Sequence, residues 1–144
     1  ELISYCDTKG IIFLSTPFDE ESIDELVDLN IPAFKVASTD TTNLLFLKKI
    51  AQKGKPMFLS TGMCHLSEVE LALKTIYEFN KDVVLLQCTA NYPIQDNEVN
   101  LAVINTYRDN FDILLISMWH QYIFSSISDD KYYDFVRLLN KDFF

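Results

Sequence analysis

The sequence predicts an α/β fold of about five βα units around a parallel sheet. Short apolar runs begin near positions 11, 33, 57, 83 and 113, so that they recur every 22 to 30 residues. The stretches between them carry apolar residues at the helical spacing of three and four. This alternation is typical of parallel strands joined by right-handed crossovers. The repeat alone fits two folds. About five strands are too few to close an eight-stranded barrel, so they would be a fragment of one, or they could form a small flavodoxin-like sheet.

The first residues, 1–10, have the pattern of a helix end that is closed by Gly10, with neither an initiator Met nor a helix start before it. We therefore expect the 144 residues to be part of a longer protein. Residues 11–14 form the first predicted strand. Asp19 or Ser22 can cap the helix that follows, and its acidic residues lie outward near the positive end of the helix dipole.

The later elements repeat this order. We predict strands at 33–38, from 57, at 83–88 and at 113–116, and helices at 44–52, at 66–79 and near 101–110. Residues 1–117 are thus predicted to form one domain. Residues 118–144 are predicted to form a divergent tail, in which an amphipathic helix begins at Asp129 and Asp130.

Composition excludes several classes of partner. The net charge of −9 repels phosphate backbones and anionic lipid surfaces, so nucleic acid and membrane are not expected partners. No apolar run approaches the roughly 18 residues of a membrane-spanning helix, and no secretion signal is visible, which predicts a cytoplasmic protein. The odd number of cysteines, three, favours reduced thiols over a disulfide framework.

Polar residues gather after the predicted strands. In parallel α/β folds these positions meet at one edge of the sheet, where ligands bind. The residues expected to converge there are Thr16, Lys35, Ser38, Ser60, Thr61, Thr89, Asn91 and Tyr92. Cys88 ends an apolar run and is interpreted as a small core residue.

Lys35 is the strongest candidate for a ligand-binding or catalytic residue. A lysine inside a run that otherwise suits a buried strand must find an anionic partner or lose its charge. Ligand binding or a Schiff base is favoured over a structural ion pair or a side chain whose end reaches solvent. With Ser38, Ser60 and nearby amides, Lys35 would form a pocket for phosphate or carboxylate.

Three further residues are weaker candidates. Asn91 and Tyr92 lie in a rigid loop that could hydrogen-bond a sugar or carboxylate, although such loops are more often simple turns. His65 could act as a general base but has no paired acid in view. His120 is a weak metal signal, because even catalytic zinc sites use about three protein ligands.

Four segments together closely resemble the sialic acid synthase (N-acetylneuraminate synthase) family. They are FLSTPFD at 13–19, PAFKVAS at 32–38, GKP and LSTGM within 54–63, and CTANYP at 88–93. The resemblance runs in order from residue 1 to about residue 112, and four ordered motifs are far more specific than any one of them. Residues 113–144 resemble the family poorly.

The resemblance implies a (β/α)8 TIM barrel, here partial, from a family whose members add a small antifreeze-like domain and work as domain-swapped dimers. It implies a transferase that condenses phosphoenolpyruvate with an N-acetylated amino sugar such as N-acetylmannosamine, giving a nonulosonic acid and phosphate for surface polysaccharide. The implied cofactor is a divalent metal, Mn²⁺ or Mg²⁺. Open strand edges also predict association into a homo-oligomer.

The resemblance also assigns roles to residues. Thr16, Lys35, Ser38 and Ser60 would hold the phosphate and carboxylate of phosphoenolpyruvate, and Tyr92 would contact the sugar. Asn91 is carried over less directly, because some members have their asparagine one residue earlier. Lys35 would be catalytic as an electrostatic clamp that shares developing negative charge with the metal. His120 would bind the metal.

The sequence departs from the family in ways that keep alternatives open. The strands that carry the family's catalytic glutamate and a second lysine would precede Glu1. Where the family has Gly-Tyr-Ser-Asp-His, residues 116–120 are ISMWH, and the second metal histidine and the C-terminal domain have no counterpart. The chain could therefore be a noncatalytic remnant with an anion-binding or interaction surface. A third hypothesis is a Schiff-base aldolase that acts through Lys35.

Overall fold

The computed structural model describes residues 1–91 and 94–117, which fall into two compact units, residues 1–13 and residues 14–117. In the first unit, α1 (Leu2–Lys9) ends at Gly10, whose backbone lies in the left-handed region at φ 64° and ψ 32°. Its N–H donates to the carbonyl oxygen of Asp7 at 3.1 Å. The predicted glycine-capped helix end is confirmed.

The second unit is built on a sheet of four parallel strands. These are β1 (Phe34–Val36), β2 (Met57–Ser60), β3 (Val83–Gln87) and β4 (Leu114–Ser117), and they lie side by side in chain order. Each strand pairs in parallel with the next. The predicted α/β fold with a parallel sheet is therefore confirmed, and all carboxyl ends of the strands lie at one edge.

The strand predicted at 11–14 is not formed. Pairing in this part of the chain is a single bridge between Ser15 and Phe34, supported by the Lys35 N–H, which donates to the Ser15 carbonyl oxygen at 3.3 Å. An apolar run forms a strand only where a neighbouring strand is long enough to pair with it. The neighbour here is β1, which has three residues. The apolar pattern was therefore insufficient to decide this element.

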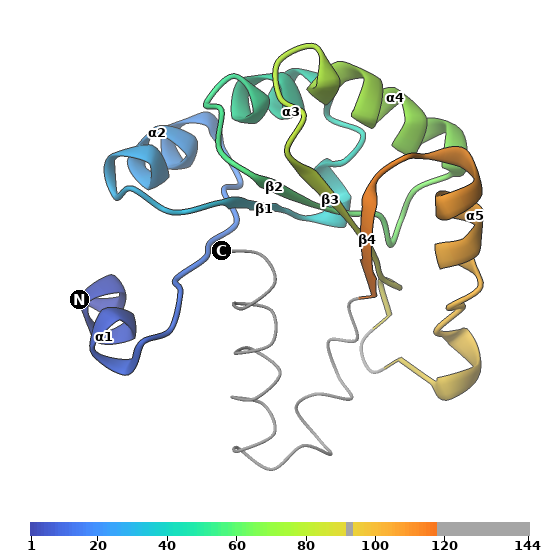
Figure 1. The fold of residues 1–144 in the computed structure, drawn as a ribbon, viewed down its shortest axis with the longest axis horizontal. Coiled ribbons are helices and arrows are strands. Elements are labelled where there is room, and N and C mark those ends of the chain that lie inside the picture. The colour runs from blue at the N-terminus through green and yellow to red at the C-terminus, as the bar shows by residue number, and fades with distance from the viewer. Residues whose placement is uncertain (92–93, 118–144) are drawn as a thin grey trace. The chain divides into compact units, whose positions relative to one another are not determined.

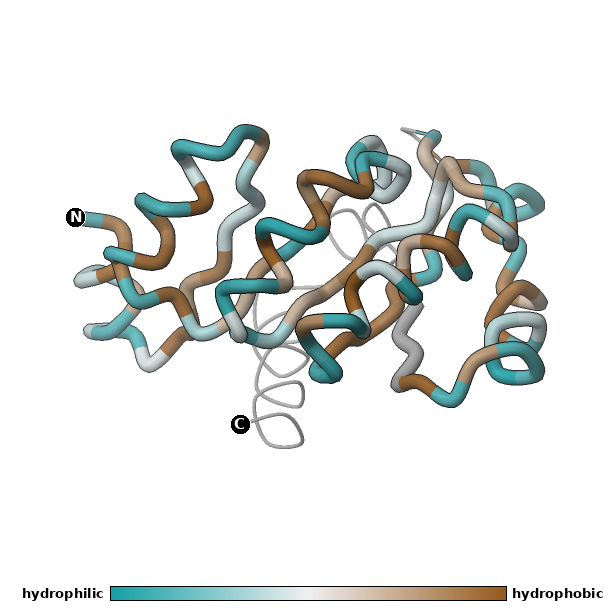
Figure 2. The backbone as a smooth tube through the Cα atoms, turned by 90° about the horizontal axis from the view of Figure 1, so that it is seen from above, coloured by the Kyte–Doolittle hydropathy of each residue, from teal (hydrophilic) through white to brown (hydrophobic). Residues whose placement is uncertain are grey.

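Helices cover one face of the sheet (Figure 1). They are α2 (Glu20–Asp28), α3 (Leu44–Ala51), α4 (Leu66–Tyr77) and α5 (Val103–Asn110), with short 3₁₀ turns η1 (Ser38–Asp40) and η2 (Asp96–Glu98). Figure 2 shows hydrophilic and hydrophobic residues alternating along these helices, as expected for elements with one buried side. None of the helices in residues 1–91 and 94–117 is long and apolar enough to cross a membrane.

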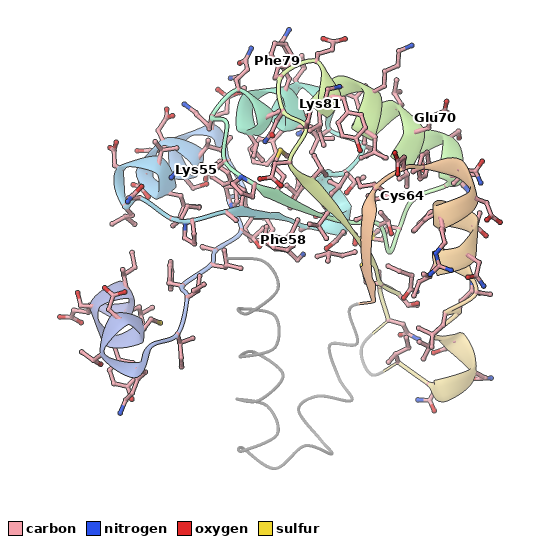
Figure 3. All side chains as sticks on the ribbon, in the orientation of Figure 1. Lys55, Phe58, Cys64, Glu70, Phe79 and Lys81 are labelled. Carbon is pink, nitrogen blue, oxygen red and sulfur yellow. The ribbon has the colours of Figure 1, made fainter. Side chains whose placement is uncertain are left out.

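The core lies between the helices and the sheet face that they cover. Phe34 and Val36 of β1 and Met57 and Leu59 of β2 are at most 1% exposed, as are several residues of α3 and α4, namely Leu47, Ile50, Val69 and Ile76. Alternate residues of a strand point to opposite faces. Lys35 and its register partner Phe58 therefore lie on the sheet face away from the helices, where Phe58 is labelled in Figure 3.

Helix α2 is fixed at its start by both of the residues that the sequence offered as alternative caps. The N–H of Ser22 donates to Asp19 Oδ1 at 2.7 Å, and the N–H of Asp19 donates to Ser22 Oγ at 3.2 Å. This reciprocal pair satisfies donors at the helix start. Two ion pairs link α2 to α3 and to the turn that follows it, one between Glu20 and Lys49 of α3 and one between Asp24 and Lys53, just past α3, at 2.6 Å.

The predicted tail, residues 118–144 with its helix, lies outside the described residues. The division into residues 1–117 and 118–144 accordingly stays a prediction.

Candidate anion-binding site

The candidate site lies where β1 and β2 part at their carboxyl ends. The last register pair is Val36 with Leu59. Beyond it, the chain leaves β1 and turns into η1, whereas β2 continues through Ser60 and stays paired with β3. Ser60 therefore has no partner residue in β1. The parting of the two strands leaves backbone groups at the sheet edge that side chains can reach.

Lys35 reaches across this parting. It is half-buried, and its Nζ donates to Ser60 Oγ at 2.5 Å and to the Val36 carbonyl oxygen at 3.3 Å. Within residues 1–91 and 94–117, the ion pairs are Glu20 with Lys49 and Asp24 with Lys53, so Lys35 has no carboxylate partner among them. Lys35 thus presents a positive charge whose described partners are neutral, an arrangement suited to an anion.

Burial lowers the pKa of Lys35, because desolvation disfavours its charged form, while Cys88 nearby acts in the opposite direction. A bound anion would likewise favour the charged form. Anion binding and protonation of Lys35 are therefore linked.

Ser38 joins the ends of three strands. It lies two residues after β1, and its Oγ accepts a hydrogen bond from the N–H of Gly62, just past β2, at 2.9 Å. The same oxygen lies 3.3 Å from the Sγ of Cys88, which follows β3. Ser38 and Ser60 are thus both positioned at the strand ends around Lys35, as the sequence predicted, although their ligand-binding roles remain proposals.

Gly62 allows β2 and β3 to approach closely at this edge. A Cβ atom at this position would lie 2.9 Å from the carbonyl oxygen of Cys88 and 3.1 Å from its sulfur. Cβ atoms in folded proteins essentially never lie as close as the shorter distance. The glycine of the LSTGM segment is therefore required by packing, and it allows the Gly62 amide to reach Ser38.

No hydrogen bond among the described residues joins Thr16 or Asn91 to Lys35, Ser38 or Ser60. Thr16 is half-buried and follows Ser15, the residue bridged to Phe34 at the edge of β1. Asn91 is exposed, and its Nδ2 donates to Glu98 Oε2 at 2.7 Å, where the N–H of Gln95 donates also, at 3.0 Å. Glu98 therefore orders the loop after β3, but the described contacts do not connect Asn91 with Lys35.

The metal prediction receives no support from the described residues. Among residues 1–91 and 94–117, no group of three or more His, Cys, Asp or Glu could hold a metal ion. His65 is exposed and its backbone N–H donates to Glu68 Oε2 at 2.6 Å. Tyr92 and His120 lie outside the described residues, so the predicted sugar contact and metal ligand stay predictions.

Sequence reasoning missed two members of the site. Cys88 was interpreted as a core residue, but it is half-exposed, with its sulfur against Ser38. Cys88 ends an apolar run, and this pattern suggested a core position. A residue at the very end of a buried strand, however, lies at the edge of the sheet. Thr41, which is fully buried, was not identified from the sequence, because it belongs to a polar segment in which threonine is an ordinary turn residue.

Comparisons with known proteins agree with the geometry. The model of the NeuB family matches residues 1–116. The N,N'-diacetyllegionaminic acid synthase of Campylobacter jejuni is 44% identical over 116 residues, which cover 78% of this chain and 35% of that protein. Human N-acetylneuraminate-9-phosphate synthase is 40% identical over 111 residues, which cover 77% of this chain and 31% of that protein.

A solved structure shows the same fold. The N-acetylneuraminic acid synthetase of Leptospira borgpetersenii, crystallised in complex with citrate, matches with a TM-score of 0.76 and 29% identity, covering 79% of this chain and 40% of that one. This likeness confirms that the parallel sheet is part of a (β/α)8 barrel. The chain spans about a third of the length of the curated relatives that it matches.

Proposed function

The chain belongs to the NeuB family, and we propose that it carries the phosphoenolpyruvate-binding part of a sialic acid-type synthase. The observation that carries the proposal is the half-buried Lys35 ammonium bonded to Ser60 between the ends of β1 and β2. The names of the relatives support the class of product, a sialic or legionaminic acid. The proposed partner substrate is an N-acetylated amino sugar.

Each residue of the site has a distinct task in this proposal. The Lys35 ammonium neutralises the phosphate or carboxylate of phosphoenolpyruvate, and it stabilises the charge that develops on the departing phosphate. The Ser60 and Ser38 hydroxyls turn toward the anion as donors, since a hydroxyl can donate as well as accept. Thr16 and Asn91 extend the site toward the rest of the substrates.

The proposed divalent metal is not assigned to the described residues, which lack a three-ligand group. When bound, such an ion would polarise the sugar aldehyde. His120 is the proposed ligand from this chain. The tasks given above to Lys35, Ser38 and Ser60 do not depend on the ion.

The test is an assay of phosphate release from phosphoenolpyruvate. It is run with N-acetylmannosamine and related sugars and with added Mn²⁺ or Mg²⁺, on the 144-residue chain and on any longer protein that contains it. We expect release that requires both substrates and a sugar-acid product by mass spectrometry, both abolished in Lys35→Met. No release with any N-acetylated hexosamine would contradict the synthase. Saturable phosphoenolpyruvate binding without release would support a noncatalytic anion-binding protein instead.

The lowered pKa of Lys35 also favours a second candidate, a Schiff-base aldolase, because a neutral amine is the nucleophile in that chemistry. Borohydride would trap the imine that Lys35 forms with a carbonyl substrate as a stable adduct. We expect no adduct, since Nζ is engaged by Ser60. A borohydride-dependent mass increase on Lys35 would establish the aldolase.

A further inference from the structure

Thr41 bridges the gap that opens between the end of β1 and Ser60 of β2. Its side chain is fully buried, and its Oγ1 lies 2.6 Å from the Ser60 carbonyl oxygen, to which it donates. The Ala37 carbonyl oxygen lies at 3.4 Å from the same hydroxyl. Ser60 is the residue whose partner in β1 is missing, so the Thr41 hydroxyl supplies a donor that a continuing strand would have supplied.

Two further hydrogen bonds span the same gap between β1 and β2. Ser38 accepts from the Gly62 N–H, and Lys35 donates to the Ser60 side chain. Thr41 and Ser38 belong to one short segment, since η1 ends one residue before Thr41 and begins at Ser38. Holding Thr41 on the Ser60 carbonyl therefore also fixes the distance between the Ser38 and Ser60 hydroxyls.

We propose that Thr41 is a positioning residue for the anion site, which sets the spacing of Ser38 and Ser60 around Lys35. The inference rests on the proposed function, since it concerns the same site. Thr41 itself is buried and acts through Ser60 and through the η1 turn. Without its hydroxyl, the Ser60 carbonyl would be left without this donor, and the gap would open.

The test is a calorimetric titration with phosphoenolpyruvate of the chain and of Thr41→Val, Thr41→Ser and Asn80→Ala. Valine replaces threonine at nearly equal volume without the hydroxyl, and we expect affinity to fall about tenfold, the effect of losing one buried hydrogen bond. Serine keeps the hydroxyl, and we expect affinity within about twofold of the wild type.

Asn80 is the matched control. It is also buried, and its Nδ2 donates to the Lys55 carbonyl oxygen at 2.8 Å, just before β2 begins, at the opposite end of the strand. We expect Asn80→Ala to lower the melting temperature and leave phosphoenolpyruvate affinity unchanged. Hydrogen exchange of the Gly62 amide gives a second measurement, which should be faster in Thr41→Val only.

The outcomes separate the two proposals. Wild-type affinity in Thr41→Val, with an unchanged Gly62 exchange rate, would overturn the positioning role while leaving the site intact. A Thr41→Ser variant that itself binds about tenfold more weakly than the wild type would overturn it too, because packing and not the hydroxyl would then matter. This outcome is measured against the wild type and does not require a folded valine variant. A wild type that does not bind phosphoenolpyruvate would overturn the proposed function and this inference together.

Discussion

Lys35 determines the electrostatics of the site at the scale of the single residue. Its ammonium is bonded to a neutral hydroxyl and a carbonyl, and it lies on the sheet face away from the helices. A lysine in such surroundings loses hydration and, within residues 1–91 and 94–117, has no carboxylate partner, which is consistent with the lowering of its pKa by desolvation. An anionic ligand would supply the missing counter-charge.

Anion binding should therefore weaken as pH rises through the lowered pKa of Lys35. The ammonium is the binding form, so affinity is highest below this pKa and is lost above it, at lower pH than for an exposed lysine. Above about pH 8 the ligand has a constant charge, since the second pKa of a phosphate ester is about 6. Titrations with phosphoenolpyruvate between about pH 8 and pH 11 test this point. An affinity that is flat over this range would contradict the role of the ammonium.

Sequence reasoning located Lys35, Ser38 and Ser60 because each follows or interrupts an apolar run. It did not locate the groups that join them. Cys88 and Thr41 matter through contacts with Ser38 and with the Ser60 backbone, which are 50 and 19 residues away in the chain. Residue type and spacing carry no information on such long-range contacts.

At the scale of the elements, helices were predicted better than strands. Helix periodicity and caps are local, so the helix expected from Asp19 or Ser22 begins after Asp19, and the one expected at 44–52 spans Leu44–Ala51. A strand depends on its partner. The run at 11–14 has suitable residues but only one bridge, at Ser15. The strand expected at 33–38 is reduced to Phe34–Val36, because the chain turns at Ser38 to form the site.

The contact between the loops after β2 and β3 makes Gly62 sensitive to substitution. In Gly62→Ala, the new Cβ would collide with backbone atoms of Cys88, which cannot move aside cheaply. We expect the free energy of unfolding to fall by about 1–3 kcal/mol, typical of overpacking, and phosphoenolpyruvate affinity to fall because the Gly62 amide moves from Ser38. Denaturant unfolding and calorimetry measure the two effects.

Gly54→Ala is the control for Gly62→Ala. Gly54 has a φ of 68° with open space around it, so alanine strains the backbone there without a collision. It precedes β2, at the end of the sheet away from Ser60. We expect lower stability with unchanged affinity. Equal losses of affinity in both variants would mean that Gly62 acts only through global stability.

At the scale of the whole molecule, the described part is a section of a barrel that brings the polar ends of β1, β2 and β3 together. The family was identifiable from the sequence because three of its four motifs lie at these strand ends, in chain order, after a first motif at 13–19 that precedes β1. The geometry adds that the motifs contact one another through Ser38 and Lys35. The sugar and metal residues could not be placed in the same way, because Tyr92 and His120 lie outside the described residues.

The central claim is that Lys35 binds the anionic end of phosphoenolpyruvate. It is tested most directly by calorimetric titration of the wild type, Lys35→Met and Lys55→Met at neutral pH. Lys55 is a matched lysine, half-buried before β2, whose Nζ donates to Asn30 Oδ1 at 3.2 Å. We predict saturable binding that is lost in Lys35→Met and retained in Lys55→Met. Binding that survives in Lys35→Met, or a wild type that shows none, would contradict the account.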